Sequence, residues 1–352
     1  MASAQPTIVP TILALHLTYR CPLQCAHCCV DAGPAKRTEL QAEQIKTLIR
    51  QAAVDCKVQG IGITGGDPFL VPELAALAVT EAKSHALRTH VVTSGYWATS
   101  VQEAGERIDA LGQDALDELC ISYDDSHARY VKFERIGYAY QAAMIRGIRV
   151  RFLITAEPGS VIDSAWVRGK IEKLENYTAG LTTFTCGSVV STGRAFVTST
   201  AALRASRAGS EDKYLGPCPI VFRRLAVNPD GNILACCGTV PFYSDLCIGN
   251  VSTHTLSDAV VGMYNNLLLK WIAFEGPAKV LKTITASDSN PLTDDDFEGI
   301  CQACDLLFST PTLRARAYAA ANEQMDRIAL EELIFRSVGH FPEFVSATTS
   351  IE

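Results

Sequence analysis

The stretch TYRCPLQCAHCCVDAGP (residues 18–34) places four cysteines in one short segment, directly after an apolar run at residues 11–17. Cys21, Cys25 and Cys28 are separated by three and then two residues, and Cys29 follows at once. Thiolates at this spacing can converge on one metal centre. The alternative is a set of buried structural cysteines, because free cysteine packs as a small hydrophobic residue.

The apolar run before this segment is the first of six with strand character. The six runs occupy residues 11–17, 59–64, 88–94, 117–123, 149–155 and 181–186. Helical periodicity is present between them, at residues 40–56, 71–86, 101–112, 127–147 and 163–175. This alternation predicts an α/β fold with a parallel sheet, either open or part of a barrel. Ligands of such folds bind at the carboxyl ends of the strands, where the cysteine segment lies.

The alternation stops near residue 195, which predicts a division of the chain. After it the sequence is small and polar, then rich in turn residues and cysteines, and finally helical. We expect one long helix over residues 310–336, because Pro311 suits the first helical position. The predicted parts are an α/β domain (1–195), a linker (196–217), a cysteine-rich β-hairpin and helix domain (218–310), and a C-terminal helix and tail (311–352).

Composition excludes several classes of protein. The 352 residues are 48% hydrophobic and 20% charged, which is a globular composition. A net charge of −7 argues against nucleic acid as a partner, and no Lys/Arg run predicts binding to an anionic membrane. We find no signal peptide and no membrane-spanning run, so we expect a cytoplasmic protein. Its 13 cysteines are then better explained as metal ligands or catalytic groups than as disulfides.

The CxxxCxxC spacing after the first strand of an α/β repeat resembles the radical S-adenosylmethionine (radical SAM) enzymes. The resemblance implies a partial (β/α)6 TIM-like barrel and a [4Fe–4S] cluster held by Cys21, Cys25 and Cys28. Three ligands leave one iron open, and in this family that iron binds the amino and carboxylate groups of SAM. One electron from the cluster then cleaves SAM to a 5′-deoxyadenosyl radical.

The same resemblance assigns residues at the strand ends to SAM: His27, Gly65, Gly66, Asp67, Ser94, Ser122, Asp124 and Arg194. Asp67 stands where the family usually has Glu, in the turn that meets the SAM ammonium. His27 is expected near the adenine, and Ser122 and Asp124 near the ribose. Each assignment has a simpler structural alternative. The Gly-Gly turn can be a tight loop, the polar strand ends can be caps, and Arg194 can pair with a surface acid.

A second cysteine group predicts a second metal site. Cys218 and Cys236 flank a strong hairpin turn at residues 228–232, and Cys301 and Cys304 supply two more thiolates. Four ligands would close an iron–sulfur cluster, although a zinc ribbon is the alternative. The pattern resembles the SPASM and Twitch extensions of radical SAM enzymes. No cysteine follows Cys304, which favours the short Twitch-like form with one auxiliary [4Fe–4S] cluster.

Cys237 directly follows an expected cluster ligand, and its thiol S–H is weak enough to give a hydrogen atom to a carbon radical. A small apolar filler is the alternative. A ligand–donor cysteine pair resembles the radical SAM peptide epimerases. We therefore expect L-to-D epimerisation of a ribosomally made peptide, with Cys237 as hydrogen donor and a flavodoxin or ferredoxin as reductant. The alternatives are thioether or carbon–carbon crosslinking of a peptide, a small-molecule substrate, and a non-catalytic iron–sulfur or zinc protein. Cys29 and Cys247 receive no role.

We predict that protein reconstituted without oxygen holds about eight irons and eight sulfides, in two clusters of four. Iron, sulfide and zinc analysis checks this number. Two to four irons together with bound zinc would instead support zinc at the second cysteine group.

Overall fold

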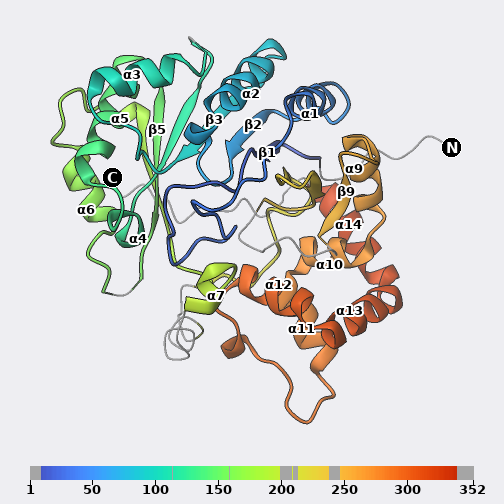
Figure 1. Ribbon diagram of the computed structural model, residues 1–352. Coiled ribbons are helices and arrows are strands. Elements are labelled where there is room, and N and C mark those ends of the chain that lie inside the picture. The colour runs from blue at the N-terminus through green and yellow to red at the C-terminus, as the bar shows by residue number, and fades with distance from the viewer. Residues whose placement is uncertain are drawn as a thin grey trace.

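The six predicted strands form a parallel sheet that curves behind an outer layer of helices (Figure 1). The computed structural model describes residues 9–112, 114–157, 159–198, 208, 213–237 and 246–338. Each strand pairs in parallel with the next one along the chain. The strands are β1 (Ile12–His16), β2 (Gly60–Thr64), β3 (Arg88–Thr93), β4 (Glu118–Ser122), β5 (Arg149–Thr155) and β6 (Thr182–Gly187). This arrangement confirms the expected partial (β/α)6 barrel.

Amphipathic helices cover the outer face of the sheet. In α1 the buried residues Ile45, Leu48, Ile49 and Ala52 recur every three or four positions, which gives the helix one apolar face. The helices of this layer are α1 (Ala42–Val54), α2 (Pro72–Ser84), α3 (Val101–Asp109), α5 (Phe133–Ile145) and α6 (Ser164–Ile171), and the short helix α4 (Asp125–Ala128) lies at the end of β4. In the described part of the chain, 3₁₀ turns occur at Pro68–Leu70, Ala179–Leu181 and, near the C-terminal helices, Asp294–Asp296.

The single helix predicted over residues 127–147 is wrong, because the chain forms α4 and α5 instead. Asp124 caps α4 by accepting hydrogen bonds from the backbone N–H groups of Ser126 and His127. Lys132 then has an extended backbone and precedes α5. The helical periodicity therefore begins only at Phe133, and α4 is a separate turn at the end of β4.

The hairpin of the cysteine-rich region continues the same sheet. β7 (Arg224–Val227) pairs in parallel with β1, and β8 (Asn232–Leu234) and β9 (Cys247–Asn250) add antiparallel strands. The Asn228 side chain accepts hydrogen bonds from two backbone N–H groups of the turn, and Gly231 has φ +78. This confirms the hairpin turn predicted at residues 228–232. The nine strands lie in the order β6-β5-β4-β3-β2-β1-β7-β8-β9.

The turn-rich sequence from residue 218 to about 305 predicts hairpins and turns, and this prediction is wrong beyond β9, because the region there is helical. The helices are α9 (Leu256–Tyr264), α10 (Leu267–Glu275), α11 (Pro277–Thr285) and α12 (Ile300–Ser309). Turn-forming residues here act as helix caps: Thr255 and Asn266 accept N-terminal backbone hydrogen bonds, and Gly276 joins α10 to α11 with φ +87. Short capped helices and strand turns use the same residue types, which explains the error.

The long helix predicted over residues 310–336 is also wrong, because it divides at Gln324 into α13 (Pro311–Glu323) and α14 (Met325–Val338). Arg327 hydrogen-bonds the Gln324 side chain, pairs with Glu275 and lies over the Trp271 ring. These contacts hold α14 against α10, so tertiary pairing explains the break better than local sequence does.

The predicted division into four parts stays a prediction. Residues 199–207 and 209–212 of the expected linker, and residues 339–352 of the expected tail, lie outside the described residues. Before them, the segment after β6 forms the short helix α7 (Arg194–Thr198). Across the described part of the chain, every helix is too short or too polar to span a lipid bilayer.

A buried side chain joins the barrel to the C-terminal helices. The Gln51 side chain of α1 accepts a hydrogen bond of 2.9 Å from the backbone N–H of Leu256, the first residue of α9. We predict that Gln51→Leu lowers the free energy of unfolding by about 1–3 kcal/mol, because it leaves this buried N–H without its acceptor. Urea unfolding followed by tryptophan fluorescence measures the loss.

Gln102→Leu on the exposed face of α3 is the matched control, since it changes the same side chain without a buried partner. Equal midpoints for the two variants would contradict a structural role for Gln51.

Candidate functional site

The cysteine loop follows β1 and is closed by hydrogen bonds between its own ends. The backbone N–H of Cys21 donates to Gly33, and the N–H of Gly33 donates to Tyr19. A tighter turn inside the loop is closed by the N–H of Cys28, which donates to the carbonyl of Cys25 at 3.2 Å. The loop therefore brings cysteines seven positions apart into one small region at the carboxyl end of the sheet.

The three predicted ligands of the first cluster are free thiols that interact electrostatically. Cys25 is buried, and Cys21 and Cys28 are partly buried. Burial, nearby Asp67, Cys25 and Cys28 together raise the pKa of Cys21 to about 12. Three mutually close thiols suit the three protein ligands of an open [4Fe–4S] cluster, and iron binding would release their protons.

The Gly-Gly turn after β2 contacts the start of the cysteine loop. The N–H of Gly66 donates to Thr18, and the N–H of Asp67 donates to Arg20 at 2.9 Å. A Cβ at Gly66 would collide with the Arg20 carbonyl, and Gly65 has φ +127 beside Thr18. Both glycines are therefore needed for close backbone packing against the cysteine loop. Their predicted contact with SAM stays a prediction.

The Asp67 carboxylate joins this turn to the end of β3. It is fully buried and accepts hydrogen bonds from the hydroxyls of Thr93 and Ser94 and from the backbone N–H groups of Ser94 and Phe69. Burial raises the pKa of Asp67, and the hydrogen bonds from Ser94 and Phe69 oppose that shift. Asp67 and Ser94, which were both predicted to contact SAM, therefore contact each other, and the Asp67 carboxylate faces the end of β3. The predicted contact of Asp67 with the SAM ammonium therefore competes with these donors.

Asp124 lies at the centre of a buried group with two histidines. Its carboxylate is 2.9 Å from Nδ1 of His127 and 3.4 Å from Nε2 of His27. Burial would raise the pKa of Asp124, but the hydrogen bond and charge of His127 lower it. Burial lowers the pKa of His27. His27 and Asp124, predicted near the adenine and the ribose, therefore lie together, while Ser122 is partly buried as the last residue of β4.

Sequence reasoning missed His127, although it stands in the segment SYDDSH (122–127) that contains Ser122 and Asp124. Burial alone would lower the pKa of His127, but hydrogen bonds to Asp124 and to the Cys25 thiol raise it to about 10. The available signal was its position three residues after Asp124, which places it at the start of a capped helical turn. The contact with Cys25, about one hundred residues away, carries no local signal.

Arg194 contacts the cysteine loop from α7. Its guanidinium donates to the carbonyl of Cys25 at 2.9 Å, to the carbonyl of Ala32 at 2.5 Å and to the Asp31 carboxylate at 2.8 Å. The preceding Gly193 packs against the carbonyls of Cys28 and Cys29, where a Cβ would collide. Arg194 therefore contacts the loop that carries the three predicted cluster ligands. Its pairing with an acid, which the sequence left open, is also observed.

The second cysteine group gathers at the far end of the hairpin. Cys218 and Cys304 lie within electrostatic range of Cys301, which is on α12 with Cys304. Burial raises the pKa of Cys218 to about 11 and that of Cys304 well above its usual value. Cys236 stands at the end of β8 in the same region. The described thiols suit a closed metal centre, and metal binding would again release protons.

Cys237 is buried next to this group. It lies within electrostatic range of Cys218 and Cys301. It also packs, as Cys247 does, against the small apolar cluster of Ala14, Ala226 and Leu234. Burial raises the pKa of the Cys237 thiol to about 11, and Arg224 opposes this shift. The thiol is therefore protonated at neutral pH.

Two interactions connect the segments that carry the two cysteine groups. Cys29, which follows the first group, lies within electrostatic range of Cys301 in the second. Burial raises the pKa of Cys29 to about 12. The Ser191 hydroxyl after β6 donates to Glu298 before α12 at 2.9 Å. The strand register nevertheless places Cys236 toward the amino ends of β1 and β7, whereas the first cysteine group follows the carboxyl end of β1.

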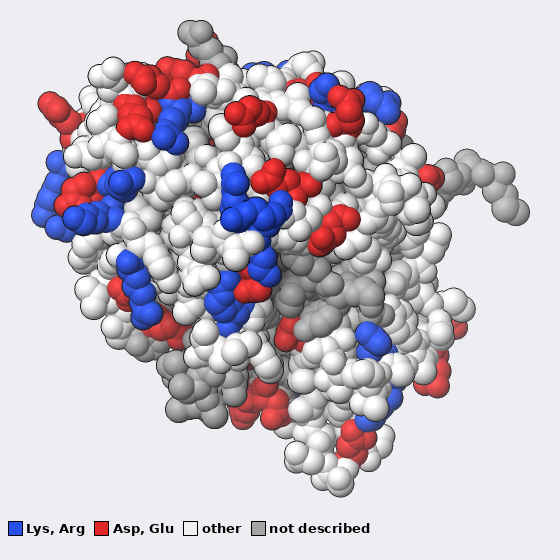
Figure 2. Space-filling view, in the orientation of Figure 1, with Lys and Arg blue, Asp and Glu red and all other residues white. Residues whose placement is uncertain are grey.

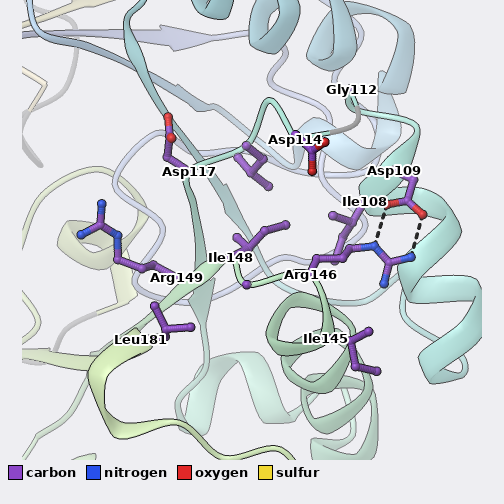
Figure 3. A pocket seen from close by; sticks show the side chains of 12 residues that line it. Ile108, Asp109, Gly112, Asp114, Asp117, Ile145, Arg146, Ile148, Arg149 and Leu181 are labelled. Atoms are coloured by element: carbon purple, nitrogen blue, oxygen red, sulfur yellow. Dashed lines mark hydrogen bonds and ion pairs between the residues drawn. The ribbon is translucent and has the colours of Figure 1, made fainter.

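A pocket of about 670 Å³ lies at the amino ends of β4 and β5, opposite the end that carries the first cysteine group (Figure 3). It is lined by the start of β5 and by the ends of α3 and α5, where Asp109 and Arg146 form two hydrogen bonds of 2.6 Å. Asp117 and Arg149 face it from the amino ends of β4 and β5. None of its described lining residues belongs to the predicted site. Figure 2 shows that acidic and basic side chains are mixed on the face drawn, so neither sign dominates it.

Two family models match the chain. The radical SAM superfamily model matches residues 15–152, and the SPASM iron–sulfur cluster-binding domain model matches residues 218–305. The two matches contain the two cysteine groups. The first begins in β1, and the second ends just after Cys304.

Curated and solved relatives are distant. The chain is 24% identical over 310 residues to YydG of Bacillus subtilis (strain 168), whose name describes a peptide biosynthesis protein, covering 85% of this chain and 92% of YydG. A crystal structure of BtrN with AdoMet and 2-DOIA matches with a TM-score of 0.46 and 15% identity, covering 84% and 92% of the two chains. Streptococcus suis SuiB bound to S-adenosylmethionine matches with a TM-score of 0.36 and 14% identity, covering 65% and 60%.

We predict that Arg194→Ala weakens the hold on the first cluster, because three acceptor groups of the cysteine loop, on Cys25, Asp31 and Ala32, lose their common donor. Reconstituted protein should lose iron to a chelator about ten times faster, a change of about 1.4 kcal/mol in the barrier. Absorbance decay of the iron–sulfur band measures the rate. Arg50→Ala on the exposed face of α1 is the control, and equal rates in both variants would refute the role of Arg194.

Proposed function

Since the chain belongs to the radical SAM family and carries a SPASM iron–sulfur domain, we propose that it epimerises an L-residue of a ribosomally made peptide. Cys21, Cys25 and Cys28 would hold the cluster that binds SAM. Cys218, Cys236, Cys301 and Cys304 would hold the auxiliary cluster. When bound, the first cluster and SAM supply a 5′-deoxyadenosyl radical.

The observation that carries this proposal is the place of Cys237. Its buried thiol lies beside Cys218 and Cys301 and against Ala14, a residue on the inner face of β1. A hydrogen donor must meet the substrate on the face opposite the radical that removed the first hydrogen. Cys237 belongs to the second cysteine group, while the radical forms at the first, so the two groups can act on one substrate carbon from different sides.

The reaction balances as two hydrogen-atom transfers. The α C–H bond of the L-residue would break, and its hydrogen atom would join the 5′-deoxyadenosyl radical to give 5′-deoxyadenosine and an α-carbon radical. The S–H bond of Cys237 then breaks, and its hydrogen forms a new C–H bond of inverted configuration. The remaining sulfur radical returns to a thiol by taking one electron and one proton. A flavodoxin or ferredoxin would supply this electron and the one that cleaves SAM.

The name of YydG supports a peptide as the substrate class, at 24% identity over most of both chains. The peptides encoded by small open reading frames beside the gene are the probes to use. Crosslinking of the same peptide is the outcome that would replace epimerisation. It removes two hydrogens and gives a product two mass units lighter.

We predict that product made in heavy water carries one deuterium at the inverted α-carbon, because the Cys237 hydrogen exchanges with solvent. Cys237→Ala should keep about eight irons and form 5′-deoxyadenosine, yet give no D-residue. Mass spectrometry and chiral amino-acid analysis measure both results. Cys236→Ala changes the neighbouring cysteine and is the matched control. It should lose about four irons, those of the auxiliary cluster.

Three outcomes would reject this assignment. One is full formation of the D-residue by Cys237→Ala, and another is a wild-type product that has lost two hydrogens. The third is loss of iron in Cys237→Ala with none lost in Cys236→Ala, which would exchange the roles of the two neighbours.

A further inference from the structure

Three side chains that can ligate a metal ion through nitrogen and oxygen meet at the end of β4: His27, Asp124 and His127. The Asp124 carboxylate is 2.9 Å from Nδ1 of His127 and 3.4 Å from Nε2 of His27. The three ligand atoms all lie within 4.8 Å of one another. His127 has no part in the reaction above, so that reaction does not account for a second histidine at this carboxylate.

The group is mostly buried, and its carboxylate is held in place. The side chains of Asp124, His27 and His127 are 2%, 16% and 13% exposed. One carboxylate oxygen accepts hydrogen bonds from the backbone N–H groups of Ser126 and His127, and such bonds orient a ligating carboxylate. The other oxygen makes longer contacts of 3.4 Å, to His27 and to the N–H of Thr155. This second oxygen can therefore take an ion, which reaches it past the exposed edges of the two rings.

The donor set and its spacing suit zinc. Zinc binds imidazole nitrogen and carboxylate oxygen with bonds of about 2.0–2.2 Å, and tetrahedral geometry then separates the ligand atoms by about 3.3 Å. The observed contacts of 2.9 and 3.4 Å are close to that separation. The two rings meet edge-on with their centroids 5.2 Å apart, so each presents its nitrogen to the carboxylate without stacking on the other. Three protein ligands leave the fourth position to water.

We propose that His27, Asp124 and His127 form a zinc site. The ion takes the place of the proton between Nδ1 of His127 and the carboxylate, and this proton leaves to solvent. No electron is transferred and no other bond breaks. The site uses no sulfur, so it is distinct from the two predicted iron–sulfur centres.

Zinc at this site has a consequence for SAM. This part of the inference rests on the proposed function, in which His27 and Asp124 contact the adenine and the ribose. The ion and its water then use the same side-chain atoms that SAM needs, so zinc and SAM exclude one another. Zinc is therefore a competitive inhibitor, and a high concentration of SAM displaces it.

The test is zinc binding to the reconstituted holoenzyme without SAM and without peptide. Equilibrium dialysis against Zn²⁺, followed by elemental analysis, gives zinc and iron per chain. The wild type should bind about one zinc that His127→Leu releases. Loss of this ligand should weaken binding about a hundredfold, since even the partners of ligands contribute tenfold to a hundredfold. His85→Leu is the matched control, because His85 pairs with Glu81 at the end of α2.

A second measurement identifies the ligands, because free cysteines also bind zinc. Zinc X-ray absorption separates nitrogen and oxygen ligands at about 2.0–2.1 Å from sulfur at about 2.3 Å. The wild type should show a nitrogen and oxygen shell that is lost in His127→Leu and kept in His85→Leu. If His127→Leu fails to retain its irons, Asp124→Asn provides the same comparison, since Asn still accepts the backbone hydrogen bonds of this turn.

Equal zinc in the wild type and in an iron-replete His127→Leu would overturn the site, as would wild-type zinc bound wholly through sulfur. SAM added at rising concentration should release the zinc, and binding of both to one chain would overturn the exclusion. Because zinc binding is measured before SAM or peptide is added, a failure of the proposed function leaves the test of the site intact.

Discussion

The functional end of the molecule depends on the packing of one loop backbone between two others. The cysteine loop receives hydrogen bonds from Gly66 and Asp67 on one side and from Arg194 on the other. The close approach leaves no room for a Cβ at Gly66 or Gly193. Because the loop is fixed through its carbonyls, its thiols remain available for metal. This is the condition under which three cysteines can bind a cluster and leave one iron open.

The barrel was predictable because its signals are local. Apart from the short helix α4, each strand and helix of residues 11–175 carries its own periodicity, and the motif residues Asp67 and Asp124 follow strands closely. The helices after β9 were not predictable from the sequence, since Asn266 and Gly276 cap helices as readily as they form turns. Contacts between distant segments also have no local sign. Arg194 reaches Cys25 across 169 positions.

Several contacts join the parts of the chain that carry the two predicted metal centres. Cys29 approaches Cys301, Ser191 donates to Glu298, and Gln51 accepts from Leu256. These contacts connect the barrel to the C-terminal region at several separate points. In the proposed reaction, a substrate carbon between the cysteine groups would be bounded on each side by parts of the protein that hold one another in place.

The position of β1 has a consequence for how the chain acquires this shape. β1 pairs with β2 on one side and with β7 on the other, although Ile12 and its partner Arg224 are far apart in the sequence. During synthesis β1 remains an unpaired edge until more than half of the chain has emerged. The barrel alone, cut after β6, would keep that edge permanently exposed and prone to intermolecular strand pairing. The auxiliary domain thus also serves as the structural cover of the catalytic sheet.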